Sequence, residues 1–187
     1  MKGVILNEFT DFAETTFAAA MADRGEVSGP DGGWDANARY DPEALAQLIG
    51  RVSAATGIAT PEVLHRFGAH LFGRFAALYP VFFLEDTSCL DFLAGIDTTI
   101  HGEIQKLYPD AEFPRFECAR PAADRLELTY RSDRGLADFA EGLLLGCIAY
   151  FGEPIHLERR DPSGSDGHVA QFSLTRQPAA ASGARRR

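Results

Sequence analysis

The sequence lacks several features that would place it in common functional classes. It has no run of about 18 apolar residues, so we expect no transmembrane helix and no membrane partner. Basic residues are few, 18 against 27 acidic ones, and the net charge of −9 argues against nucleic acid as the main partner. Acidic residues interrupt the apolar pattern of the N-terminus, which therefore does not read as a signal peptide. These properties predict a cytoplasmic protein.

Cysteine is also scarce. Cys89, Cys118 and Cys147 are far apart and odd in number. They form no C-x-x-C pair, no zinc-ligand spacing and no C-x-x-C-H sequence for covalent haem attachment. We therefore expect three reduced thiols.

Apolar residues, in contrast, make up 45% of the 187 residues, which is enough for one domain with a real core. Periodicity and turn residues predict helices over 1–21, 41–57, 60–80, 88–108 and 136–151, strands over 115–120 and 125–131, and two short strands around a loop at 162–167. A glycine-rich loop is expected at 25–39, and a disordered basic tail from Pro178. Helices followed by strands with an intervening helix indicate an α+β fold.

Three polar residues stand at alternate positions where the second predicted strand ends: Tyr130, Ser132 and Arg134. Side chains two residues apart share a face, and Leu126 and Leu128 direct this face towards the core. Two hydroxyls and a guanidinium are therefore expected to point inwards. Because no acidic residue shares that face, we expect an anion from outside the chain, with carboxylates beside apolar surface. The alternative is a solvated strand end with a boundary tyrosine.

Among the five histidines, His101 is the strongest candidate ligand. It lies beside the apolar stripe of the predicted helix over 88–108, one turn after Asp97, and Gly102 removes bulk next to it. A neutral imidazole on the wall of a dry cavity can bind haem iron. The commoner situation for a lone helical histidine is a half-buried ring that bonds to Asp97 or to a carbonyl.

A helical histidine followed about 30 residues later by Tyr-x-Ser-x-Arg resembles the haem-nitric oxide/oxygen binding family, the H-NOX domains. The resemblance covers about residues 1–175. Its further matches are Met1-Lys2-Gly3, Phe67-Gly68, Leu71-Phe72, Ile100-His101-x-Glu103, Lys106-Leu107-Tyr108, Pro114 and Glu141-Gly142-Leu143-Leu144. It implies an α+β H-NOX fold in a single domain, 1–177. A helical lobe (about 1–60) and a lobe of antiparallel sheet and helices (about 61–177) would hold haem between them, with 178–187 as the tail.

The resemblance also implies a b-type haem that is held without covalent attachment. His101 would be the proximal iron ligand, and Tyr130, Ser132 and Arg134 would bind the propionates. The other haem-binding positions are apolar: Pro114, Ile5, Phe75, Leu143, Phe9, Leu71 and Phe139.

The distal positions differ from those of the oxygen-binding branch of the family. A distal tyrosine there donates a hydrogen bond to bound oxygen, whereas the matching residue here is Phe139, and the supporting positions are Phe9 and Leu71. Such a bond is worth about 1.5–3 kcal/mol, or roughly 10- to 100-fold in affinity. We therefore expect nitric oxide and carbon monoxide to bind, with little oxygen binding. The sequence leaves open whether His70 or Tyr79 reaches the distal side.

The resemblance implies a sensor and no enzyme. Nitric oxide would release the proximal histidine, and the signal would pass in trans to a histidine kinase or to a diguanylate cyclase or phosphodiesterase, since the chain carries no effector domain. Some bacterial relatives have a cysteine-rich zinc site near the C-terminal hairpin, but that region here has no cysteine, so no zinc is expected. Two alternatives stay open: an oxygen-binding haem protein or enzyme, and a haem-less module that binds a small carboxylate.

Overall fold

The computed structural model describes residues 1–21, 33–83 and 86–178. The elements in chain order are α1 (Gly3–Thr16), α2 (Ala18–Met21), α3 (Pro42–Thr56), α4 (Thr60–Leu78), η2 (Pro80–Phe82), α5 (Cys89–Ala94), η3 (Ile96–Ile100), α6 (His101–Leu107), β1 (Arg115–Ala122), β2 (Arg125–Arg131), α7 (Ala137–Phe151), β3 (Ile155–Arg160) and β4 (Val169–Arg176). Most of the expected loop at 25–39 and of the tail lies outside the described residues. Among the described helices, none is long and apolar enough to cross a membrane.

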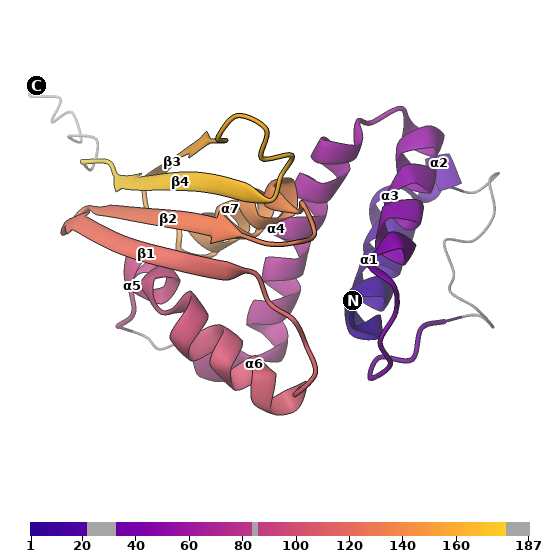
Figure 1. Cartoon of the computed structure of the whole chain (residues 1–187), viewed down its shortest axis with the longest axis horizontal. Helices are drawn as coiled ribbons and strands as arrows, with labels where there is room; N and C mark the ends of the chain where they lie inside the picture. The colour runs from indigo at the N-terminus through magenta and orange to yellow at the C-terminus, as the bar shows by residue number, and fades with distance from the viewer. Residues whose placement is uncertain (22–32, 84–85, 179–187) are drawn as a thin grey trace, which may run out of the picture.

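The four strands form one antiparallel sheet in the order β1-β2-β4-β3 (Figure 1). Alternation along each strand gives the sheet one apolar face, which is covered by α5 and α7. The buried residues of this face are Phe116, Leu126, Leu128, Tyr130, Ala170, Phe172 and Leu174. Because Tyr130 pairs with both Phe116 and Ala170, it lies inside the sheet, in its buried layer. The predicted α+β fold is confirmed.

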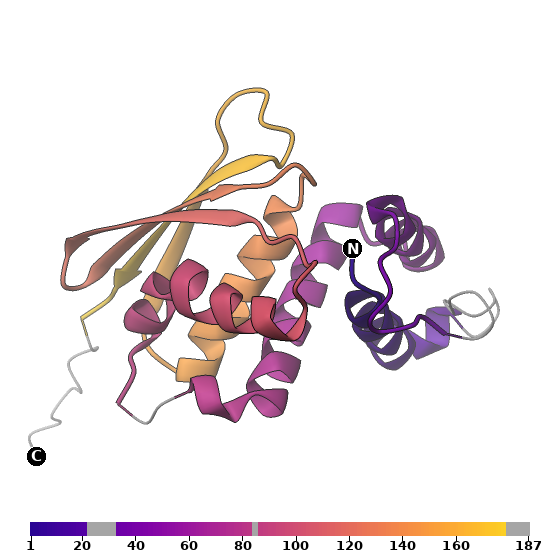
Figure 2. The same cartoon turned by 60° about the horizontal axis from the view of Figure 1, so that its bottom comes forward.

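The apolar core has two clusters, and α4 contributes to both. Figures 1 and 2 show α1, α2 and α3 on one side and the sheet on the other, with α4 and α7 between them. The first half of α4 packs with α1 and α3 through Val63, Leu64 and Phe67, and the second half packs towards the sheet through Phe72 and Ala76. The division into lobes near residue 60 stays a prediction, since α4 runs through both clusters.

The predicted helix over 88–108 is interrupted. It consists of α5, a single π-helical segment η3 and α6, and Gly95 separates the first two. The amide of Ile100 bonds to the carbonyl of Gly95, five residues back, at 3.4 Å. Three β-branched residues in a row at 98–100 crowd a regular helix, and π turns are common at functional sites. His101 is the first residue after this turn. The first predicted helix also breaks, at Phe17, between α1 and α2.

Helices α4 and α7 cross in close contact because glycines face the partner backbone. A Cβ atom at Gly68 would lie 2.3 Å from the carbonyl oxygen of Phe139, and one at Gly142 would lie 2.1 Å from that of His65. Gly146 is similarly close to Phe72 and Ala69. This contact sets how near the side chains of α7 come to those of α4.

Replacing Gly142 by alanine should therefore destabilise the protein by about 1–3 kcal/mol, because the backbone of one helix has to shift. Chemical denaturation of the purified protein measures the change. Gly73 is the control: it is also in α4, but a Cβ atom there meets nothing within 4 Å, so Gly73→Ala should stabilise by about 0.5–1 kcal/mol. Equal stability of Gly142→Ala and the unmodified protein would contradict the close contact.

Candidate functional site

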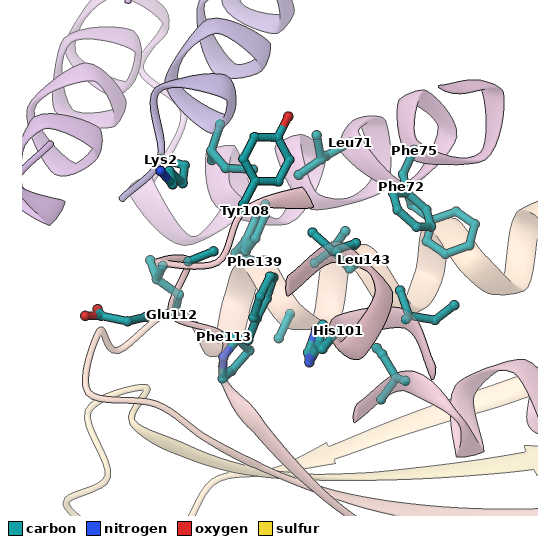
Figure 3. A pocket seen from close by; sticks show the side chains of 18 of the residues that line it. Lys2, Leu71, Phe72, Phe75, His101, Tyr108, Glu112, Phe113, Phe139 and Leu143 are labelled. Carbon is teal, nitrogen blue, oxygen red and sulfur yellow. The ribbon is translucent and has the colours of Figure 1, made fainter. Parts of the chain in front are cut away.

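A cavity of about 300 Å³ lies where α1, α4 and α7 meet α6, the loop over 108–114 and the end of β2. Its walls are mostly apolar. The predicted site residues that line it are Ile5, Leu71, Phe75, His101, Pro114, Tyr130, Ser132, Arg134, Phe139 and Leu143. In the view of Figure 3, His101 and Phe113 lie below Leu71, Phe139 and Leu143. The structure thus brings together residues that are up to 138 positions apart in the chain.

His101 is held by the helix turn that precedes it. Its Nδ1 lies 3.0 Å from Oδ1 of Asp97, and the other oxygen of Asp97 accepts the amide of Phe116 at 3.2 Å. The ring stacks on Phe113, with centroids 4.7 Å apart. Burial lowers the pKa of His101, and Asp97 opposes that shift, so the ring is neutral at pH 7. A carboxylate at Nδ1 favours the proton there and leaves Nε2 with a free lone pair, as in metal-binding histidines.

The hydroxyls and the guanidinium of the strand end converge as predicted, but Arg134 has a partner within the chain. Tyr130 is 2% exposed and packs on Phe116 at 5.5 Å. Burial raises its pKa, and a hydrogen bond with Ser132 opposes this. Arg134 Nη2 lies 2.7 Å from Oε2 of Glu112. Arg134 thus has an acidic partner that strand alternation could not reveal, because Glu112 comes from the loop before β1, and the expected anion from outside the chain stays a prediction.

One end of the cavity is charged, which the sequence did not predict. Lys2 Nζ lies 2.6 Å from Oδ1 of Asp110, and Arg39 forms an ion pair with Glu112. All four residues line the cavity. Lys2 and Glu112 lie at one end of the view in Figure 3, with the phenylalanines of α4 at the other. Spacing gave no signal for these pairs, because their members are more than 70 residues apart.

The wall opposite His101 carries no hydrogen-bond donor at Leu71, Phe139 or Leu143. Phe9, the other distal position, does not line the cavity. It is fully buried and packs edge-on against Phe67 at 5.0 Å, and Phe67 in turn stacks on Phe139 at 5.2 Å. Phe9 therefore supports the wall from behind, since its side chain points into the core of the helical lobe.

Of the two polar residues left open by the sequence, Tyr79 lines the cavity and His70 does not. Burial raises the pKa of Tyr79, and the neighbouring Tyr108 raises it further. Nε2 of His70 is buried and has no hydrogen-bond partner among the described residues, and burial lowers its pKa.

None of the three cysteines lines the cavity. Cys89 and Cys147 are buried with their sulfur atoms 3.7 Å apart, and Cys118 is exposed on the sheet. Within the described ranges, no group of three or more His, Cys, Asp or Glu side chains could hold a metal ion. A metal in this site would therefore take one protein ligand, His101, and would need further ligands from a cofactor.

Known proteins match both the sequence and the fold. The sequence model of the haem-NO-binding family matches residues 2–159. The chain is similar to an H-NOX protein from Shewanella woodyi whose solution structure is IWP-051-bound and in the Fe(II)CO state, with 30% identity, 98% of both chains covered and a TM-score of 0.77. No curated protein matches in the corresponding search.

Two crystal structures extend this likeness. The Fe(II) unliganded H-NOX protein from K. algicida is 27% identical, with 95% of this chain and 97% of that chain covered and a TM-score of 0.84. An H-NOX protein from S. oneidensis in the Fe(II)NO state is 21% identical over 95% of this chain and 100% of that chain, with a TM-score of 0.81, and shows the fold alone.

The Asp97 contact predicts the tautomer of His101. In the protein without cofactor at pH 7.5, the ring proton should be on Nδ1, and Asp97→Ala should move it towards Nε2. Ring nitrogen chemical shifts from NMR measure this. Asp91→Ala is the control, because Asp91 pairs with Arg120 and not with His101. The same tautomer with and without Asp97 would show that Asp97 does not set it.

Proposed function

Because this chain belongs to the haem-NO-binding (H-NOX) family of haem-based gas sensors, we propose that it binds b-type haem and senses nitric oxide with little response to oxygen. The observation that carries the proposal is one cavity that combines an available imidazole at His101, a cationic end at Arg134 and a donor-free wall at Phe139.

The residues present fit haem. The walls are apolar, as a porphyrin face requires, and His101 offers Nε2 to iron. Tyr130, Ser132 and Arg134 offer donors for two carboxylates at the cavity end. The cysteines lie elsewhere, so attachment through thioethers has no residue to use and the haem would be of the b type. When bound, haem supplies the ferrous iron that takes up a diatomic gas.

The wall around Phe139 would set the choice of gas. Oxygen binding gains from a distal hydrogen-bond donor far more than nitric oxide binding does. Leu71, Phe139 and Leu143 have no donor, and Tyr79, which also lines the cavity, lies beside Tyr108. The missing bond is worth about 1.5–3 kcal/mol against oxygen. Carbon monoxide, which is bound in the S. woodyi relative, would bind here by the same reasoning.

Signalling would run through α6. None of the seven residues of α6 is fully buried, so few apolar contacts oppose its movement once His101 is released. The loop that follows α6 carries Asp110 and Glu112 to cations of the N-terminal segment, and movement of α6 would therefore reach the helical lobe. A partner responds only as far as it prefers one of the two states.

We propose a sensor without catalytic activity that acts on a partner in trans, a histidine kinase or a diguanylate cyclase or phosphodiesterase. The support for this class of partner is the family resemblance. Co-purification of the chain with candidate partners, compared with and without nitric oxide, tests it directly.

The selectivity predicts a simple result in air. The reduced haem-loaded protein should show no stable oxygen complex by absorption spectroscopy, whereas Phe139→Tyr should raise oxygen affinity by roughly 10- to 100-fold. Nitric oxide affinity should change little in the same variant and serves as the internal control. A stable oxygen complex of the unmodified protein would refute the selectivity.

The ligand role of His101 predicts loss of haem in His101→Gly, with recovery when imidazole is added, because the small ligand can occupy the vacated space. The Soret band after haem supplementation measures both. His156→Gly is the control, since the His156 side chain is 58% exposed on the sheet. An unaltered ferrous spectrum of His101→Gly would exclude this residue as the ligand.

A further inference from the structure

We propose that Glu112 is an internal substitute for a haem propionate: it holds Arg134 and Arg39 in the arrangement described above and yields both when haem binds. Arg39 then becomes a propionate-binding residue supplied by the helical lobe, in addition to the Tyr-x-Ser-x-Arg group. The proposal rests on the proposed binding of haem and concerns which residues compete for its carboxylates.

Each oxygen of the Glu112 carboxylate holds a different arginine. Oε2 lies 2.7 Å from Nη2 of Arg134, and Oε1 pairs with Arg39. The carbonyl oxygen of Glu112 also accepts Nη1 of Arg134 at 3.3 Å. Both arginines lower the pKa of Glu112, through hydrogen bonds first, so it is ionised at neutral pH. A propionate is the same chemical group and would make the same bonds.

The exposed fractions of the two side chains indicate which of them leaves the Arg134–Glu112 ion pair when haem binds. The side chain of Arg134 is 19% exposed and belongs to the cavity end, whereas that of Glu112 is 58% exposed. A carboxylate that is half in solvent can turn outwards and regain its hydration at small cost. In Figure 3 the Glu112 carboxylate points away from the apolar side chains of the cavity. The anion is therefore exchangeable, and the guanidinium stays in place.

The local charges are compatible with this exchange. The cations at this end are Lys2, Arg39, Arg134 and the N-terminal ammonium group of Met1, against the two carboxylates of Asp110 and Glu112. Two propionates would balance the two excess positive charges. At the two arginines, however, retention of Glu112 would place its carboxylate beside a propionate, and like charges repel. If Glu112 turns into solvent, this repulsion is relieved.

The exchange would change what connects the two lobes. Glu112 lies on the loop that follows α6, and it bridges Arg39 of the N-terminal segment to Arg134 beyond β2. After the exchange a propionate makes that bridge, and of the loop's two ion pairs to the described N-terminal residues the Lys2–Asp110 pair is kept. Loading with haem would therefore free the loop next to α6 to move when His101 is released.

The decisive variant is Glu112→Gln, which removes the charge and keeps the shape. Its affinity for hemin, taken from rates of uptake and of transfer to an acceptor protein, should be roughly two- to fivefold higher than that of the unmodified protein. Arg39→Gln should lower the affinity by a similar factor. Glu117→Gln is the matched control. Glu117 is 59% exposed and pairs with Arg131 on the outer face of the sheet, so this variant should bind hemin as tightly as the unmodified protein.

The dimethyl ester of haem, which carries no propionate charge, distinguishes the mechanism. With this ester, Glu112→Gln and Arg39→Gln should both bind with the same affinity as the unmodified protein. Thermal unfolding gives an independent readout, because Glu112→Gln should melt earlier than the unmodified protein without haem and no earlier with it. The proposal is overturned if Glu112→Gln binds hemin no more tightly, if its advantage persists with the ester, or if Arg39→Gln binds normally. Absence of a Soret band in the unmodified protein would overturn haem binding itself.

Discussion

The close crossing of α4 and α7 is the constraint on which the site depends. Gly68, Gly142 and Gly146 leave no space for a side chain between the two backbones. Because the helices touch there, Phe139 and Leu143 reach the same cavity as Leu71 and Phe75 of α4. A larger separation would open the wall to water. A water molecule could then donate a hydrogen bond there, although the side chains of the wall carry no donor.

The side of the cavity that carries His101 is built on a different principle. His101 lies on a short helix without buried residues, and its orientation comes from a π turn and from Asp97, which also fixes the start of β1. One side of the site is therefore rigid because backbones touch, and the other is held by a few polar contacts. A sensor needs this difference in rigidity between the two sides, since a signal requires one side to move while the other keeps its shape.

Much of the fold and part of the candidate site could be predicted from the sequence, because they depend on local periodicity. Alternation predicted a shared face for Tyr130 and Ser132, and both line the cavity, although β2 ends at Arg131. Arg134 also lies beyond the strand, and its role depended on the family resemblance. The partner of Arg134 could not be predicted, because Glu112 reaches it from a loop. Phe9 shows a further limit: a matching position in the chain does not fix the direction in which a buried side chain points.

The two unlike ends of the cavity, one charged and one lined by phenylalanines, have a consequence for how a porphyrin would be oriented. If haem binds with its propionates at the charged end, that end would determine which edge of the ring faces outwards. It would not determine which face meets His101, since turning the ring over keeps both propionates at the same end and exchanges only vinyl and methyl groups. That choice would fall to shape alone, at the apolar end formed by Phe72 and Phe75. Two rotational isomers of the cofactor would therefore form on reconstitution, in proportions set by packing and indifferent to salt.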